Sequence, residues 1–461
     1  MEIKVFGSAK EVTGSCYSLV TKEEKILVDC GMFQGGKDNV RKNFEPFPFN
    51  PKEYSALLLT HAHLDHCGRI PKLVKDGFRG KIFATPATKD LALVIMMDSA
   101  KVGAEETKHE NKRRAEEGLP PRKPLYDDFD VRNTMKLFVK VEYCEETKIT
   151  KNISAMFYDA GHILGSSSIQ VHVNEKIKTS VVFSGDLGQS SSVLVKKIDP
   201  IKKADYVFIE STYGDRLHEP IEKRKTELIR VIKESYKRGG KLMIPSFAVE
   251  RTQELLYYIG KFMREGLVPR MQVFLDSPMA MKATDVFTKY PDYYNQDVQN
   301  SLKDKVELFD FPELTRTESV EDSKKINSIE GPCIVIAGNG MCSAGRIKHH
   351  IRNNIDDPKS TLLFVGFQVT GTLGYWIKKG ETKIKLLGDE KEVFAKIESI
   401  EGFSAHADYP VLIDWLKDYS PKPKRIFITH GELEQSIAFE DRIKKEKFIT
   451  YIPSLGEKLE L

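Results

Sequence analysis

The sequence predicts an α/β protein in which a domain with a parallel, doubly wound sheet is inserted into a β-rich outer domain. In the first part of the chain, short β-like runs are separated by glycine turns. From about Leu217 onward, strand-like runs alternate with amphipathic helices, and near Glu392 the earlier pattern returns. We therefore expect an outer domain over 1–207, completed by 391–461, and an inserted domain over 208–390.

The outer domain opens with closely spaced apolar runs that are typical of strands. These runs are EIKVFG, CYSLVT, KILVDCG and ALLLTH. Helical patterns follow in RIPKLVKDG and ATKDLALVIMMDSAKVG. The charged stretch over 105–124 has almost no apolar periodicity, which favours a solvated helix end or a loop. Strand-like runs then return in SAMFYDAGH, SIQVHV, TSVVFSGDLG and DYVFIESTYG.

The inserted domain begins with a clear amphipathic helix, IEKRKTELIRVIKESYKR, which ends at two glycines. After it, the strand KLMIPSF precedes the helix ERTQELLYYIGKFMREG, and the strand MQVFLDSP precedes the helical run KATDVFTKY. The fully apolar runs CIVIAGNG and TLLFVGF come later. This alternation indicates a parallel sheet covered by helices.

The composition argues against a polycationic tail, a disulfide-rich protein and a membrane-spanning protein. Hydrophobic residues make up 40% of the 461 residues and charged residues 30%, while the net charge is only +4. The six cysteines are scattered without any CxxC spacing, which favours reduced thiols. No apolar run approaches the ~20 residues of a membrane span, and the N-terminus has no signal-peptide pattern. We therefore expect a cytoplasmic protein without a membrane partner.

The densest chemical motif is HAHLDH, which directly follows the apolar run YSALLL. His61 and His63 are two residues apart at a strand end, so both rings can point to one side and bind one cation. Asp65 and His66, farther round the turn, could serve a second cation. Imidazole and carboxylate ligands suit first-row divalent ions, and zinc is the leading candidate.

One turn cannot complete two coordination shells, so other loops must supply further ligands. Three candidates follow β-like runs and are flanked by glycines, namely His162 in GHILG, Asp186 in SGDLG and His430 in THGE. Taken singly, each could be an ordinary turn residue, but the joint pattern favours a metal site. Asp29 in LVDCG could fix the tautomer of a ligand histidine, or could simply end a strand.

At this point the motifs resemble a known family. VDCG, HAHLDH, GHILG and SGDLG are similar to the consecutive motifs of the metallo-β-lactamase fold. FIESTYG, GFSAHADY and ITHGE resemble the three motifs of its β-CASP branch, at Glu210, His406 and His430. The chain thus resembles RNA-processing ribonucleases of this branch in their short bacterial and archaeal form, similar to the cleavage and polyadenylation endonuclease subunit.

The resemblance implies a metallo-β-lactamase αββα sandwich with an inserted α/β β-CASP domain, and two zinc ions per chain. It assigns His61, His63 and His162 to one ion, and Asp65, His66 and His430 to the other. By the same resemblance Asp186 bridges the two ions and Asp29 supports the ligands. Asp65 and Asp186 then count as catalytic residues, together with His406 and Glu210.

The implied reaction is hydrolysis of an RNA phosphodiester by a hydroxide held between the two metals. His406 is the candidate acid for the leaving 3′-oxygen, and Glu210 would orient its ring. His430 in the third motif points to RNA, because relatives that act on DNA usually have valine there. Endonucleolytic and 5′-exonucleolytic action both remain open.

RNA contacts are expected where strands of the inserted domain run into glycine-rich turns and helix starts, as in GNGMCSAGRIKHH. The candidate residues are Ser246, Arg251, Ser343, Arg346, His349 and Thr372. Serine and threonine at such places are also common as purely structural caps. We expect single-stranded RNA as the substrate, and the sequence leaves a homodimer open.

Two other functions compete with this one. The first is a small-molecule hydrolase of the same fold, such as a thioesterase, but such enzymes lack the Glu210 and His406 pair. The second is a non-catalytic RNA-binding scaffold, because some β-CASP relatives have lost their metal ligands. Every candidate ligand is present in this sequence.

Overall fold

The computed structural model describes residues 1–189, 192–366 and 368–461. The chain divides into two units, with unit 1 formed by 1–217 and 406–461 and unit 2 by 218–405. Unit 2 therefore starts and ends later than the inserted domain expected over 208–390. Unit 2 starts later than expected because strand β11 (Tyr206–Glu210) pairs in parallel with strands of unit 1.

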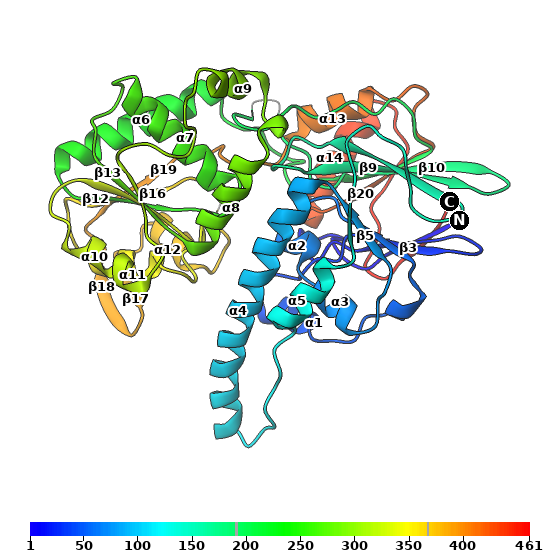
Figure 1. Cartoon of the computed structure of the whole chain (residues 1–461), viewed down its shortest axis with the longest axis horizontal. Coiled ribbons are helices and arrows are strands. Elements are labelled where there is room, and N and C mark those ends of the chain that lie inside the picture. The colour runs from blue at the N-terminus through cyan, green and yellow to red at the C-terminus, as the bar shows by residue number, and fades with distance from the viewer. Residues whose placement is uncertain (190–191, 367) are drawn as a thin grey trace. The chain divides into compact units, whose positions relative to one another are not determined.

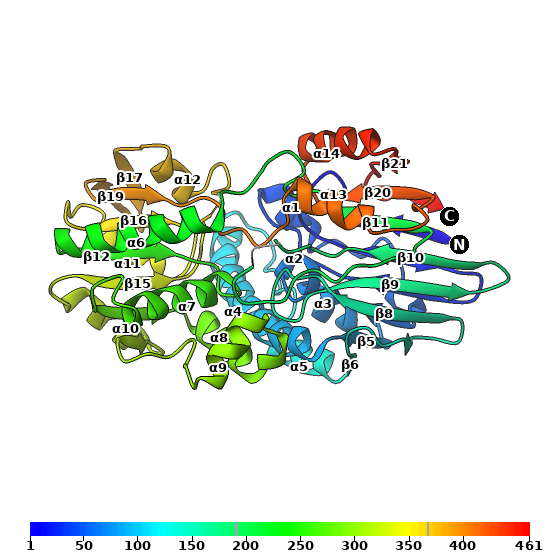
Figure 2. The same cartoon turned by 90° about the horizontal axis from the view of Figure 1, so that it is seen from above.

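Unit 1 contains two seven-stranded sheets. The first has the order β22 (Lys458–Glu460), β1 (Glu2–Val5), β2 (Tyr17–Val20), β3 (Lys25–Val28), β4 (Ala56–Leu58), β5 (Lys81–Ala84) and β6 (Phe138–Lys140). The second has the order β21 (Thr450–Tyr451), β20 (Arg425–Thr429), β11, β10 (Lys178–Phe183), β9 (Ser167–Asn174), β8 (Ile153–Asp159) and β7 (Thr147–Lys148). Figure 2 shows the second sheet from above.

The facing sides of the two sheets form one hydrophobic core. Along β8 buried and half-buried residues alternate strictly, as expected for a strand with one face in the core. At the centre of the core, the Phe208 ring is stacked between Phe183 and Phe427, with centroid distances of 5.0 and 4.6 Å. Tyr17 on β2 of the first sheet packs against Phe183 and Phe208 at 5.4 and 5.6 Å between centroids, so aromatic side chains join the two sheets.

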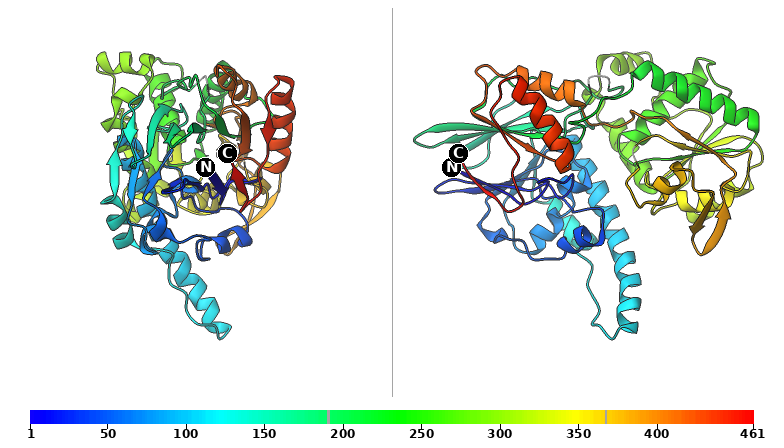
Figure 3. Two further views of the ribbon diagram at one scale, coloured as in Figure 1. Left: turned by 90° about the vertical axis from the view of Figure 1, so that its right-hand side faces the viewer. Right: turned by 180° about the vertical axis from the view of Figure 1, so that it is seen from behind.

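Helices cover the outer faces of both sheets, which gives the αββα sandwich of the metallo-β-lactamase fold (Figure 3). The second sheet carries α13 (Tyr409–Lys417) and α14 (Leu433–Lys445), whose apolar residues pack with those of β11 and β20. The other helices of unit 1 are α1 (Lys37–Lys42), η1 (Pro51–Glu53), α2 (Leu64–Cys67), α3 (Ile70–Lys75), α4 (Pro86–Glu116) and α5 (Asp128–Met135).

Helix α4 extends well into the charged stretch and projects from the rest of unit 1 (Figure 1). Beyond Ala100 only Thr107 is buried in this helix, so packing cannot explain its length. Ion pairs of Arg113 with Glu110 and Glu117, three and four residues apart, stabilise it locally instead. Among the described residues, no helix combines the length and apolar character that a membrane span requires.

Unit 2 is built on a six-stranded sheet in which every pairing is parallel. Its order is β14 (Leu314–Arg316), β13 (Gln272–Asp276), β15 (Cys333–Ala337), β12 (Lys241–Pro245), β16 (Thr361–Phe364) and β19 (Lys396–Ser399). A separate hairpin joins β17 (Lys383–Leu386) and β18 (Asp389–Glu392). Phe367, the end of the strand expected from TLLFVGF, lies outside the described residues.

Helices lie on both faces of this sheet, as a doubly wound fold requires. Figure 1 shows α6 (Ile221–Arg238) and α7 (Arg251–Arg264) on the face opposite α11 (Ile347–Asn354) and α12 (Leu373–Lys378). The remaining helices are α8 (Pro278–Lys289), η2 (Pro291–Tyr293), α9 (Gln296–Lys303), α10 (Val320–Lys325) and η3 (Ile326–Ser328). The α/β fold class predicted from the sequence, with a parallel sheet in the inserted part, is therefore confirmed.

The stacked rings in the core of unit 1 lead to a stability prediction. Phe208→Ala should lower the free energy of unfolding of unit 1 by about 3–5 kcal/mol, because it removes a ring packed on both faces. The measurement is urea unfolding followed by Trp415 fluorescence in a Trp376→Phe background, so that the only tryptophan left is in unit 1. Phe129→Ala, at a site 69% exposed, should change the same free energy by less than about 0.5 kcal/mol.

Candidate functional site

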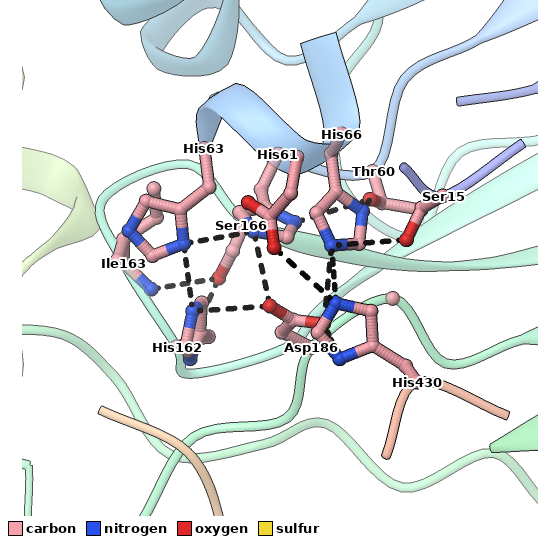
Figure 4. A network of polar contacts seen from close by, with 12 residues as sticks. Ser15, Thr60, His61, His63, His66, His162, Ile163, Ser166, Asp186 and His430 are labelled. Carbon is pink, nitrogen blue, oxygen red and sulfur yellow. Dashed lines mark hydrogen bonds and ion pairs between the residues drawn. The ribbon is translucent and has the colours of Figure 1, made fainter. Parts of the chain in front are cut away.

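The candidate ligands lie where strands of unit 1 end. His61 and His63 follow β4, and Asp65 and His66 are on the short helix α2. The other ligands come from the second sheet: His162 follows β8, Asp186 follows β10 and His430 follows β20. Since β10, β11 and β20 are parallel, their carboxyl ends reach the same edge. Figure 4 shows the side chains converging there.

The first group of ligands surrounds one oxygen of Asp186. His61 Nε2 lies 3.3 Å and His162 Nε2 3.6 Å from Asp186 Oδ2. His63 Nδ1 lies 3.1 Å from His61 Nε2 and 3.2 Å from His162 Nε2. One ligand atom from each of these four residues therefore lies within 4.8 Å of all the others.

The second group faces the other oxygen of the same aspartate. His66 Nε2 lies 3.3 Å and His430 Nδ1 3.5 Å from Asp186 Oδ1. Asp65 Oδ2 completes the group at 3.4 Å from His430 Nε2. The two oxygens of Asp186 thus point toward two separate ligand groups, the arrangement that a carboxylate shared by two cations needs.

Three observations indicate that these side chains could bind metal ions. Among the described residues, no group donates a hydrogen bond to either oxygen of Asp186, although both oxygens are buried. The facing nitrogens and oxygens are 3.1–3.6 Å apart, close to the ~3.3 Å edge of a tetrahedron with bonds of about 2.0–2.1 Å. Imidazole and carboxylate are also the usual ligands of zinc and related ions.

Burial keeps part of the histidine cluster in the form that binds metals. It lowers the pKa of His61 to about 3 and that of His63 to about 4. His162, which is also buried, has its pKa lowered well below the ordinary value for the same reason. At neutral pH these three rings are uncharged, and a neutral imidazole is the form that coordinates a cation.

Asp29 contacts the Nδ1 atom of His66, on the side of the ring that faces away from the ligand group. Its Oδ2 lies 2.8 Å from His66 Nδ1 and accepts a hydrogen bond from Thr60 Oγ1 at 2.8 Å. Its Oδ1 accepts from the Thr60 backbone N–H at 2.8 Å. The carboxylate therefore holds the Nδ1 proton of His66 and leaves Nε2 facing the ligand group, which is the usual role of a carboxylate behind a metal-binding histidine.

His406 and Glu210 form a second functional pair next to the ligand cluster. His406 Nδ1 lies 3.1 Å from Glu210 Oε2, and the His406 ring is 4.7 Å from that of His162 between centroids. Burial lowers the pKa of His406, but the carboxylates of Glu210 and Asp186 raise it more, to about 9. The ring is therefore protonated at neutral pH and can act as a proton donor.

Glu210 is almost completely buried, at 1% exposure, and also binds the backbone beside Asp186. Its Oε1 accepts a hydrogen bond from the Leu187 N–H at 2.6 Å. The same carboxylate thus orients His406 and fixes the loop that carries the central aspartate of the cluster.

Several neighbours of the site carried no signal in the sequence. The Tyr213 ring is stacked with that of His406 at 6.2 Å between centroids and 21° between planes. Thr212 Oγ1 lies 3.1 Å from His430 Nδ1, and Ser15 Oγ lies 3.4 Å from His66 Nε2. For Thr212 and Tyr213 the one possible signal was their position close to Glu210 in FIESTYG.

In unit 2, several candidate RNA contacts lie on loops at the carboxyl edge of the parallel sheet. The Ser246 N–H, after β12, donates to the carbonyl of Ala337, at the end of β15. Arg251 Nη1 donates to the Val365 carbonyl after β16. Ser343 lies exposed in the loop after β15. Loops after β12, β15 and β16 are thereby brought together at the edge where parallel sheets usually bind ligands.

Two of the remaining candidates, Thr372 and Arg346, have structural partners of their own. Thr372 is the N-cap of α12 and accepts from the Tyr375 N–H at 3.2 Å. Arg346 Nη1 donates to the buried Asp276 carboxylate and to the Thr317 carbonyl, both at 2.7 Å. His349 is exposed on α11. Arg346 is therefore engaged within unit 2, which makes it a weaker candidate for direct phosphate binding than the sequence suggested.

Comparison with known families and structures agrees with this geometry. Residues 9–80 match the metallo-beta-lactamase superfamily. Residues 252–377 match the Beta-Casp domain, and residues 390–453 match the Zn-dependent metallo-hydrolase RNA specificity domain. The crystal structure of a protein of unknown function from Enterococcus faecalis aligns with this structure at a TM-score of 0.58 and 13% sequence identity. The alignment covers 100% of this chain and 99% of the other, so the two proteins share the fold.

Curated relatives match nearly the whole chain. Ribonuclease TTHA0252 of Thermus thermophilus is 36% identical over 438 residues, which cover 95% of each chain. An RNase J-like protein of Methanocaldococcus jannaschii is 31% identical and covers 98% of both chains. The transcription termination factor FttA of Methanosarcina mazei is 31% identical over 97% of this chain and 69% of its own. The chain therefore belongs to the β-CASP family of proteins with the metallo-β-lactamase fold.

Proposed function

We propose that this protein is a zinc-dependent ribonuclease that hydrolyses phosphodiester bonds of single-stranded RNA. The observation that carries the proposal is the His406–Glu210 pair, which lies directly beside seven candidate metal ligands, five of them buried. The ligand set alone would fit many hydrolases, but a phosphodiester also needs a proton for its leaving oxygen. The names of two relatives, a ribonuclease and an RNase J-like protein, favour RNA as the substrate.

The ligand set would hold two zinc ions, with His61, His63 and His162 around one and Asp65, His66 and His430 around the other. Bound there, such ions supply an activated water and offset the negative charge of a phosphodiester. The protein's own contribution is to keep the rings of His61, His63 and His162 uncharged by burial, which lowers their pKa values, and to orient His66 through Asp29. Asp186 faces both groups and would join them.

His406 would give its proton to the leaving 3′-oxygen of the RNA. The ring is 20% exposed, so it can reach a substrate, whereas its partner Glu210 is buried. Glu210 binds Nδ1, which leaves Nε2 as the atom that donates the proton. When the proton has left, the neutral ring is still held in place by its contact with the carboxylate.

The carboxyl edge of the unit 2 sheet would bind the RNA backbone. Ser246, Arg251, Ser343 and Thr372 come from the loops and helix starts at this edge, and His349 adds an exposed ring on α11. Such groups contact phosphate rather than bases, so binding should depend little on sequence. The match of residues 390–453 to an RNA specificity domain also supports an RNA substrate.

End-labelled RNA tests the proposed activity. Single-stranded RNA carrying a 5′-monophosphate, triphosphate or hydroxyl group should be cleaved when zinc is present, and a panel of thioesters should not react. Internal fragments would show endonucleolytic cleavage, and a ladder of mononucleotides would show 5′-exonucleolytic cleavage. Thioester hydrolysis without RNA cleavage would contradict the proposal, and RNA binding without any cleavage would identify a scaffold instead.

Metal analysis tests the ligand assignment. The purified protein should contain about two zinc ions per chain, and removing them with a chelator should lower the melting temperature reversibly, because only the folded protein binds them. Asp186→Ala should reduce the zinc content to below about one ion per chain, since both ions would share this residue. His172→Ala, on β9 and away from the cluster, should leave the zinc content unchanged.

His406→Ala should lower kcat for RNA at least about 100-fold, the effect of losing a general acid. Zinc content and the Kd for uncleaved RNA should stay as in the wild type, because neither depends on the proton. His109→Ala, at an exposed histidine of α4, is the control and should retain full activity. Normal RNA cleavage by His406→Ala would show that another group is the acid.

A further inference from the structure

The loop between β12 and α7 exposes a phenylalanine where every neighbouring residue is buried. Of residues 241–250, nine are buried, and Phe247 is the exposed one, at 47%. Its neighbours Ser246 and Ala248 are 2% and 6% exposed. Leaving a phenylalanine ring in water forgoes the free energy that its burial would supply. The direction of this side chain therefore needs a reason other than the packing of unit 2.

The backbone of Phe247 is held on both sides. The Ser246 N–H donates to the Ala337 carbonyl at 3.0 Å. Thr252 Oγ1 donates to the Phe247 carbonyl at 2.6 Å, and Ser246 Oγ lies 3.2 Å from the same oxygen. These contacts fix the place from which the ring projects, so a ligand that binds the ring loses little free energy in ordering it.

Gly340 lies against the Phe247 ring, in the loop after β15. A Cβ atom on this glycine would lie 3.1 Å from two atoms of the ring, so the ring sits directly on the backbone. The loop after β16 is attached to the same place. Gln368 Nε2 donates to the Gly340 carbonyl at 3.0 Å, and the Val369 N–H lies 3.4 Å from Met341 Sδ. Three loops of unit 2 therefore meet beside one exposed ring.

The small area of this apolar surface favours a nucleobase over a protein partner. A specific protein–protein interface buries about 800 Å² on each partner, far more than one ring and the half-exposed Val369 can offer. A nucleobase presents a flat aromatic face, and exposed aromatic side chains bind such faces in proteins that hold single strands. Ser343, a candidate phosphate contact, is exposed in the same loop as Gly340. A base and its phosphate could thus be bound side by side.

We propose that Phe247 stacks on a base of the bound RNA, at a site that the loops of unit 2 form by themselves. The inference rests on the proposed ribonuclease function and adds one base contact to the backbone contacts of this edge. Because every base has an aromatic face, such stacking would hold RNA of any sequence. Binding would weaken, however, when the base itself is missing.

Equilibrium binding of RNA tests the proposal without depending on cleavage. The parent protein is zinc-loaded His406→Ala, and the probe is a 5′-phosphorylated oligouridylate of about 12 nucleotides. Phe247→Leu, which keeps an apolar side chain but removes the aromatic face, should raise the Kd about fivefold to 100-fold, the range expected for one lost stacking contact. Phe247→Tyr, which keeps the face, should bind within about twofold of the parent.

Phe394→Leu is the matched control in unit 2. Phe394 is more exposed than Phe247, at 57%, but it precedes β19, whereas Phe247 follows β12. Since both strands belong to the same parallel sheet, the two rings lie at opposite edges of it. The control should bind the oligouridylate as tightly as the parent does.

An abasic oligomer of the same length separates stacking from a structural effect. It keeps the ribose and phosphate groups but has no base, so the parent, Phe247→Leu and Phe247→Tyr should all bind it with the same Kd. An equal loss for Phe247→Leu on both oligomers would show that the substitution disturbs the backbone contacts, and would overturn the inference. Binding of the oligouridylate by Phe247→Leu as tight as by the parent would also overturn it. If the parent does not bind the oligouridylate at all, the proposed function fails together with this inference, and that outcome is distinct.

Discussion

The buried carboxylate of Asp186 sets the main constraint on unit 1. Three rings lie near one of its oxygens and two near the other, and neither oxygen accepts a hydrogen bond from any described residue. Burial alone would raise the pKa of this group, but the charges of His430, His66 and neighbouring rings bring it well below the ordinary value. A carboxylate that stays ionised in such a place needs positive charge beside it. The surrounding loops are arranged to supply that charge or to bind cations that do.

The ligands can surround Asp186 only if the backbones of the loops that carry them lie in direct contact. A Cβ atom on Gly188 would lie 1.6 Å from the Gly161 carbonyl oxygen, so the loop carrying Asp186 touches the loop carrying His162 directly. Gly185 has a φ of +57° and lies against Thr60, which itself binds Asp29. Glycine at these two positions lets three ligand loops meet, and any larger residue would separate them.

The sequence predicted the features that depend on local residue types and missed those that depend on tertiary pairing. HAHLDH and the glycine-flanked histidines and aspartate have distinctive spacing, and the strand–helix alternation showed the parallel sheet. The sequence of strand β11 resembles that of the strands before it, and its pairing with β10 and β20 assigns it to unit 1. Arg346 had the charge of a phosphate ligand, but the buried Asp276 that engages it lies 70 residues away.

Glu210 has a consequence for how this family can change. Both of its oxygens face the His406 ring, and Oε1 also accepts from the Leu187 amide beside Asp186. The His406 ring contacts Glu210 and the rings of His162, Tyr213 and His430, all at the site itself, so a lineage that no longer needed proton transfer could replace it. It could not discard Glu210 as freely, because the Leu187 N–H would be left buried and without an acceptor. In descendants that have lost catalysis, the carboxylate should therefore outlast the histidine, and an orphaned glutamate at this position would be the trace of a former enzyme.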